Sequence, residues 1–120
     1  MEGNNIAKLI GIMFMSRTYA HMAHLKTPSY AKHKALNGFY DEIVCLADSV
    51  AEASQGVFGK LDIPYIELKG DVEDPIDALE THMKMVENLK RTCKYDFIDN
   101  ILQEVLACYS KTLYLLRELS

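Results

Sequence analysis

The sequence predicts an all-α fold, an antiparallel four-helix bundle in a single domain that covers residues 1–120. Four stretches of the chain carry apolar residues three and four positions apart, which is the spacing of an amphipathic helix. Glycine and proline concentrate between these stretches, and half of the six glycines lie in residues 56–74. A chain of 120 residues has the length of one domain with a modest core.

The first two predicted helices span residues 5–25 and 28–56. Thr27 suits the N-cap of the second helix, and Pro28 suits its first turn. Apolar side chains are so dense along this second helix that we expect much of it to be buried. They are Leu36, Phe39, Tyr40, Ile43, Val44, Leu46, Ala47 and Val50.

The last two predicted helices span residues 75–92 and 95–119, and Asp74 suits the N-cap of the first of them. A long crossover, residues 56–74, joins the second helix to the third. We interpret it as a loop, although its segment 63–66 has strand-like residues. Bundles of the ferritin-like type also have one long crossover, so this connection is compatible with a ferritin-like four-helix bundle, the class that we predict.

Composition excludes several functional classes. The chain has 13 basic and 17 acidic residues, a net charge of -4, which disfavours binding to the phosphate backbone of DNA. The polar N-terminus is unlike a signal peptide, and no apolar stretch has membrane-spanning length. The three cysteines, Cys45, Cys93 and Cys108, form no CxxC motif. They predict reduced, mostly buried thiols and a cytoplasmic protein, in a bacterial cytosol or a phage-infected cell.

Candidate metal ligands gather around the second predicted helix. His21 and His24 share a face near the end of the first helix, His33 opens the second, and Asp48 and Glu52 share a face further along it. Imidazole nitrogens combined with carboxylate oxygens suit iron, zinc or manganese. Such residues also form solvated faces and ion pairs, so a salt-bridge network between subunits is the alternative interpretation.

The spacing of these ligands predicts a dimer. Fifteen residues separate His33 from Asp48, which is ~22 Å along a helix, so the two cannot bind one ion within one straight helix. Their directions around the helix differ by only ~60°. If two chains pack their second helices antiparallel about a twofold axis, His33 of one chain meets Asp48 and Glu52 of the other.

A known family has a similar pattern. Two histidines separated by eleven residues, His21 and His33, are followed by Asp48-Ser49-Val50-Ala51-Glu52 and then by Gly56. This segment resembles the ferroxidase region of Dps proteins, the mini-ferritins of starved bacteria. The spacing matches without a gap over about a third of the chain.

The resemblance implies oxidation of iron(II) at a site between subunits and storage of iron in a hollow shell. It implies nitrogen ligands His21 and His33 from one chain and oxygen ligands Asp48 and Glu52 from its twofold partner. Asn37 stands where the family has an aspartate, so a second iron would be held more weakly. The chain lacks the Lys-rich tail with which DNA is coated, and its compactness suits a phage-encoded relative.

The alternative function is a non-catalytic ferritin-like oligomer that binds a protein partner or a small ligand. It is motivated by Asn37 and by the shortened chain. The sequence has no P-loop, dinucleotide fingerprint or G-x-S-x-G motif, so ferroxidase activity is the one enzymatic hypothesis. We expect His24 to be either a further ligand or a structural residue, His82 to face solvent, and Cys45 to lie in the core.

Overall fold

The computed structural model describes residues 2–67 and 74–119, and these residues form four helices and no strand. The helices are α1 (Glu2–Lys26), α2 (Tyr30–Phe58), α3 (Pro75–Lys90) and α4 (Asp96–Glu118). Each lies within a few residues of its predicted position, so the all-helical class and the order of the elements are confirmed. The predicted loop character of the crossover is confirmed for residues 59–67, which have no regular structure.

The start of α2 differs slightly from the prediction. Ser29, not Thr27, is its N-cap, and the Ser29 hydroxyl accepts a hydrogen bond from the amide of Lys32 at 3.2 Å. The Thr27 hydroxyl instead accepts from the amide of Ser29, also at 3.2 Å. Pro28 therefore lies in the turn, because the two side-chain oxygens order the connection before the first helical residue.

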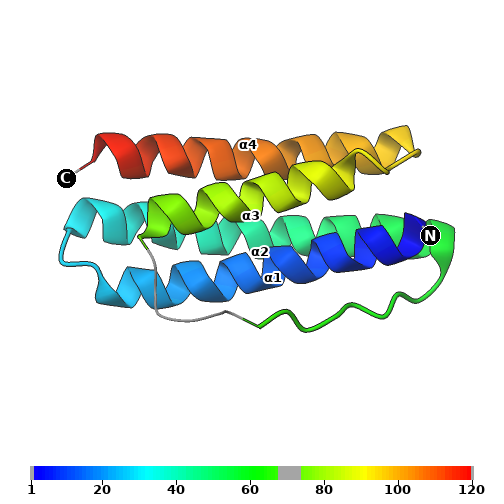
Figure 1. The fold of residues 1–120 in the computed structure, drawn as a ribbon, viewed down its shortest axis with the longest axis horizontal. Helices are drawn as coiled ribbons and strands as arrows, with labels where there is room; N and C mark the ends of the chain where they lie inside the picture. The colour runs from blue at the N-terminus through cyan, green and yellow to red at the C-terminus, as the bar shows by residue number, and fades with distance from the viewer. Residues whose placement is uncertain (1, 68–73, 120) are drawn as a thin grey trace.

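All neighbouring helices in the bundle run antiparallel (Figure 1). Each of α1 and α4 packs directly against both α2 and α3, whereas the backbones of α1 and α4, and those of α2 and α3, are not adjacent. Because α2 and α3 run in the same direction, the chain must travel the length of the bundle between them. The predicted long crossover is therefore confirmed, and the ferritin-like assignment within this class stays a prediction.

Helix α1 is the most enclosed element. Leu9, Ile10, Ile12 and Met13 are all fully buried. Their side chains point in different directions around the helix, so α1 must be covered on more than one side. Helices α2 and α3 cover part of α1, and the crossover covers another part. At Gly11 a Cβ atom would lie 2.6 Å from the carbonyl oxygen of Pro64, so only glycine allows the crossover to pack this closely.

The core runs the length of the bundle and draws on every helix. Its largest fully buried side chains are Tyr109, Phe39, Ile6, Leu9, Ile10, Ile12, Met13, Leu36, Ile43, Leu79, Ile98 and Leu102. Among the described residues, no helix is long and apolar enough to cross a membrane.

Candidate functional site

The turn between α1 and α2 brings together two of the predicted metal ligands, His24 and His33. The Nδ1 atom of His24 lies 2.7 Å from the carbonyl oxygen of His33, and Nδ1 of His33 lies 2.8 Å from the carbonyl oxygen of His24. Because a carbonyl oxygen can only accept, both Nδ1 atoms must carry the proton. The two rings stack with centroids 3.5 Å apart. The stack and the two hydrogen bonds hold the end of α1 against the start of α2.

Aromatic and amide groups extend this cluster along α2. His21 stacks on Tyr40 with ring centroids 4.3 Å apart, and His24 meets Tyr40 edge-on at 5.3 Å. The Tyr40 hydroxyl donates to Oδ1 of Asn37 at 2.9 Å, and the Asn37 amide donates to Asp41 at 2.9 Å. We call His21, His24, His33 and Tyr40 the turn cluster; Asn37 contacts it through Tyr40.

The remaining predicted ligands lie elsewhere. Asp48 and Glu52 are exposed further along α2, whereas His33 is half-buried beside His24 of α1. Within the described parts of one chain, no three His, Cys, Asp or Glu side chains are arranged to hold a metal ion. The predicted metal site needs a second chain, so it and its ligands His21, His24, His33, Asn37, Asp48 and Glu52 stay a prediction.

A second histidine site lies inside the bundle. The Tyr109 hydroxyl of α4 donates to the Ser16 hydroxyl of α1 at 2.7 Å, and Ser16 Oγ lies 2.8 Å from Nδ1 of His82 on α3. Tyr19 packs edge-on against the His82 ring at 5.8 Å. We call Tyr109, Ser16 and His82 the core polar chain. The prediction that His82 faces solvent was wrong, because His82 is on the buried side of α3 and only 8% exposed.

Burial determines what the core polar chain can do chemically. Desolvation lowers the pKa of His82 from 6.5 to about 4, so its ring is neutral at neutral pH. Burial raises the pKa of Tyr109 well above its usual value, so the hydroxyl keeps its proton. Ser16 and His82 are within the distance of a nucleophile and its base, but Ser16 is fully buried. A substrate cannot reach Ser16 in this conformation, and the chain acts as a structural link between three helices.

The cysteines only partly follow the prediction of buried thiols. Cys108 is buried, and burial together with the nearby Glu42 carboxylate raises its pKa to about 12. Cys93 is half-buried, but Cys45 is exposed on α2, so its expected place in the core was wrong. Cys45 points outward because α2 buries the residues on its opposite side, among them Ile43 and Ala47.

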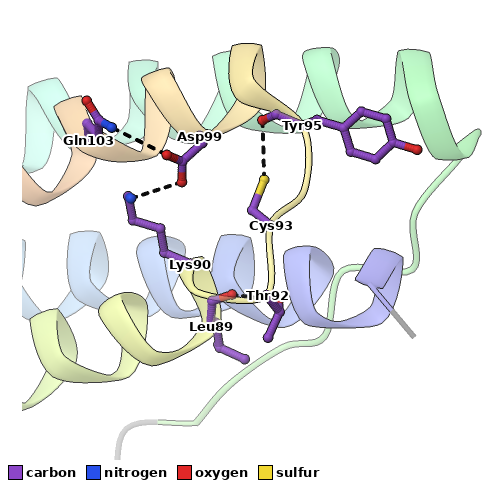
Figure 2. A network of polar contacts seen from close by, with 7 residues as sticks. All are labelled: Leu89, Lys90, Thr92, Cys93, Tyr95, Asp99 and Gln103. Carbon is purple, nitrogen blue, oxygen red and sulfur yellow. Dashed lines mark hydrogen bonds and ion pairs between the residues drawn. The ribbon is translucent and has the colours of Figure 1, made fainter.

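The connection between α3 and α4 is held by a separate polar network (Figure 2). Lys90 pairs with Asp99 at 2.9 Å, and the Gln103 amide donates to the other oxygen of the same carboxylate at 3.3 Å. The Thr92 hydroxyl donates to the carbonyl of Leu89, and the Cys93 thiol to that of Tyr95. These contacts fix the turn between the two helices.

Sequence reasoning missed the core polar chain entirely. Its members are separated by at least 27 residues in sequence, and each resembles an ordinary helical residue in its own stretch. One signal was available: His82 lies on the same side of its helix as the apolar residues Leu79 and Val86, three positions before and four after it.

Comparison with known proteins places this chain in a family. The sequence profile of a family described as "Family of unknown function (DUF5856)" matches residues 24–116. The chain belongs to this family. It is also 35% identical over 57 residues to the "Uncharacterized 14.6 kDa protein in mobD-ri intergenic region" of Enterobacteria phage T4. That match covers 48% of this chain and 44% of the phage protein. No solved structure matches.

The family match overturns the resemblance to Dps proteins. The segment from His21 to Gly56 lies almost wholly inside the region that matches DUF5856, so its histidine and carboxylate spacing is not the mark of a mini-ferritin. The expectations of iron oxidation and of a storage shell rested on that resemblance, and no comparison supports them. The phage relative agrees with the expected link to phages.

Proposed function

We propose that this protein is a non-enzymatic helical binding module that works as a homodimer, formed by the outer faces of two antiparallel α2 helices. The observation that carries the proposal is the row of exposed residues along α2. We call this row the outer face of α2, and its members are Tyr30, Lys34, Gly38, Asp41, Cys45, Asp48, Glu52 and Gly56.

Charge supports contact with a second copy of the same chain. The outer face is positive near its start, at Lys34, and negative towards its end, at Asp48 and Glu52. None of these three side chains forms an ion pair with any residue in 2–67 or 74–119. In an antiparallel pair the positive part of one helix faces the negative part of the other, and a twofold axis satisfies both ends at once.

Shape supports one register of that pair. A Cβ atom at Gly38 or Gly56 would meet nothing within 4 Å, so both positions leave open space on the surface. Tyr30, by contrast, is 74% exposed and projects from the same face. When Lys34 is aligned with Glu52 of the second copy, large residues meet glycines. The facing pairs are Tyr30 with Gly56, Lys34 with Glu52, Gly38 with Asp48, and Asp41 with Cys45.

A charge exchange tests this interface. We expect the wild-type chain to sediment as a dimer in analytical ultracentrifugation, and Lys34→Glu to weaken the dimer because like charges then face each other. The double variant Lys34→Glu with Glu52→Lys should restore it. Lys84→Glu, on the exposed side of α3, is the matched control and should leave the dimer unchanged. The proposal would be refuted if the wild-type chain were a monomer, or if Lys34→Glu and Lys84→Glu affected the dimer equally.

Cysteine cross-linking tests the register independently. In this register, Cys45 of each chain faces Asp41 of the other, so the two Cys45 thiols lie near each other across the twofold axis. A short bis-maleimide should join two chains through Cys45 in a Cys93→Ser background, which removes the half-buried thiol. Cys45→Ser should abolish the cross-link. A product that persists without Cys45 would place the interface elsewhere.

A further inference from the structure

A small pocket opens at the end of the bundle where α1 meets α2 and where α3 begins. Its volume is about 210 Å³. Its apolar walls include Ala23, Leu36, Ile76 and Leu116, and three of these, Ala23, Leu36 and Leu116, are buried residues of the core. We call this the end pocket. The turn cluster and the outer face of α2 contribute no residue to it.

Two lysines line the end pocket, and neither has a carboxylate partner within residues 2–67 or 74–119. Lys26 and Lys32 are both lining residues, and neither forms an ion pair within the described parts of the chain. The polar groups beside them already have partners. The Asp74 carboxylate accepts from the amide of Ile76 at 3.4 Å, and the Thr27 hydroxyl accepts from the amide of Ser29. The pocket therefore combines apolar walls with two positive charges that have no ion-pair partner in the part of the chain that the structure describes.

The sequence shows that this positive charge is local. Residues 3–40 contain five lysines and arginines and no aspartate or glutamate, although the whole chain has a net charge of -4. Lys26 and Lys32 both belong to that acid-free stretch. An anion that approaches this end of the bundle meets two cations, with the Asp74 carboxylate as the opposing charge in the lining.

We infer that the end pocket binds a small organic anion, an apolar body of about the size of one aromatic ring that carries a single carboxylate or phosphate group. A dry apolar cavity of about 150 Å³ accommodates benzene, so this larger pocket has room for a ring and the first atoms of a substituent. The ring lies against Leu36, Ile76 and Leu116. The anionic group stays at the opening, beside Lys26 and Lys32.

Four probes separate the contributions of ring and charge. Benzoate and phenyl phosphate carry both, benzyl alcohol carries the ring without the charge, and inorganic phosphate carries the charge without the ring. We expect saturable amide shifts in ¹H–¹⁵N spectra, centred on Leu36, Ile76 and Leu116, with at least one of the first two probes. Tighter binding of benzoate or of phenyl phosphate identifies the anionic group. If benzyl alcohol or inorganic phosphate binds as tightly as benzoate and phenyl phosphate do, the inference is wrong.

Lysine variants test the charges directly. Lys32→Met keeps the apolar stem and removes the ammonium group, and it should weaken binding of the tighter probe about fivefold, the upper range for a single exposed charge pair. Lys84→Met, an exposed residue of α3 outside both the pocket and the outer face of α2, is the matched control and should leave binding unchanged. Equal effects of the two variants, or no saturable shifts with any probe, would overturn the inference. If the chain is a monomer and still binds benzoate, the proposed dimer is wrong but the inference about the end pocket stands.

Discussion

Two histidine sites in this bundle differ in which parts of the chain they connect. At the turn cluster, His24 and His33 each donate to the backbone of the other, and both belong to helices that follow one another in sequence. In the core polar chain, His82 of α3 hydrogen-bonds the side chain of Ser16 and packs against Tyr19, both from α1, and Ser16 in turn accepts from Tyr109 of α4. The first arrangement closes a local turn, whereas the second fixes how α1, α3 and α4 lie relative to one another.

The difference has an energetic consequence. At the turn cluster His24 is buried, but His21, His33 and Tyr40 are only half-buried, so water can replace part of a lost contact there and the net cost stays moderate. A lost partner in the core leaves buried polar atoms that water cannot reach, and each such atom costs more than an average hydrogen bond contributes. We therefore expect the core polar chain to be the more sensitive of the two sites.

The largest effect should come from removing the central hydroxyl of the core polar chain. Ser16→Ala leaves the Tyr109 hydroxyl and Nδ1 of His82 buried without partners, which should reduce the free energy of unfolding by about 3 kcal/mol. Urea unfolding measures this. Ser110→Ala, an exposed serine on α4, is the control and should change stability by less than about 0.5 kcal/mol. Equal effects of the two substitutions would remove the energetic contrast between core and surface.

An effect of similar size should appear on acidification. Folding lowers the pKa of His82 to about 4, whereas the unfolded chain titrates at its ordinary 6.5. Between these values the unfolded state binds more protons, so stability falls as the pH falls from 6.5 to 4, by about 3 kcal/mol in total. His82→Gln cannot titrate and should flatten this part of the stability curve. If the free energy of unfolding changed with pH in the same way for the wild type and the variant between pH 4 and 6.5, this role of His82 would be wrong.

A smaller effect is expected at the turn cluster. His24→Ala or His33→Ala removes one hydrogen bond and one side of the ring stack, and each should cost about 1 kcal/mol. The other ring keeps its own bond, because that bond goes to a backbone carbonyl. A double-mutant cycle therefore isolates the stacking energy, which we expect to be about 0.5–1 kcal/mol. A coupling near zero would show that the 3.5 Å stack contributes nothing to stability.

The smallest effect should follow from Tyr40→Phe. The ring that stacks on His21 remains, and only the hydrogen bond from the hydroxyl to Asn37 is lost. Because Tyr40 and Asn37 are both half-exposed, water can replace this bond, and we expect a cost of about 0.5 kcal/mol. Thermal unfolding would measure it. A loss as large as that of Ser16→Ala would mean that the turn cluster is as sealed from water as the core.

The sequence by itself determined the local structure. Helical spacing of apolar residues, the Asp74 cap and the gathering of glycines in 56–74 were enough to predict four helices and a long crossover, because these signals act over one or two turns. The sequence also placed His24 near the end of the first helix and His33 at the start of the second. The similarity of spacing to Dps proteins misled us, because few positions carried it.

Only the tertiary structure decided which polar residues face inward. His82 and Cys45 were assigned to the wrong sides, because periodicity locates a helix face but does not show which neighbours cover it. The core polar chain joins residues from three helices, and no local pattern records that contact. Lys26, Lys32 and the walls of the end pocket likewise come together only when α3 and α4 pack against the turn. Their proximity depends on long-range packing, which is a property of the folded chain alone.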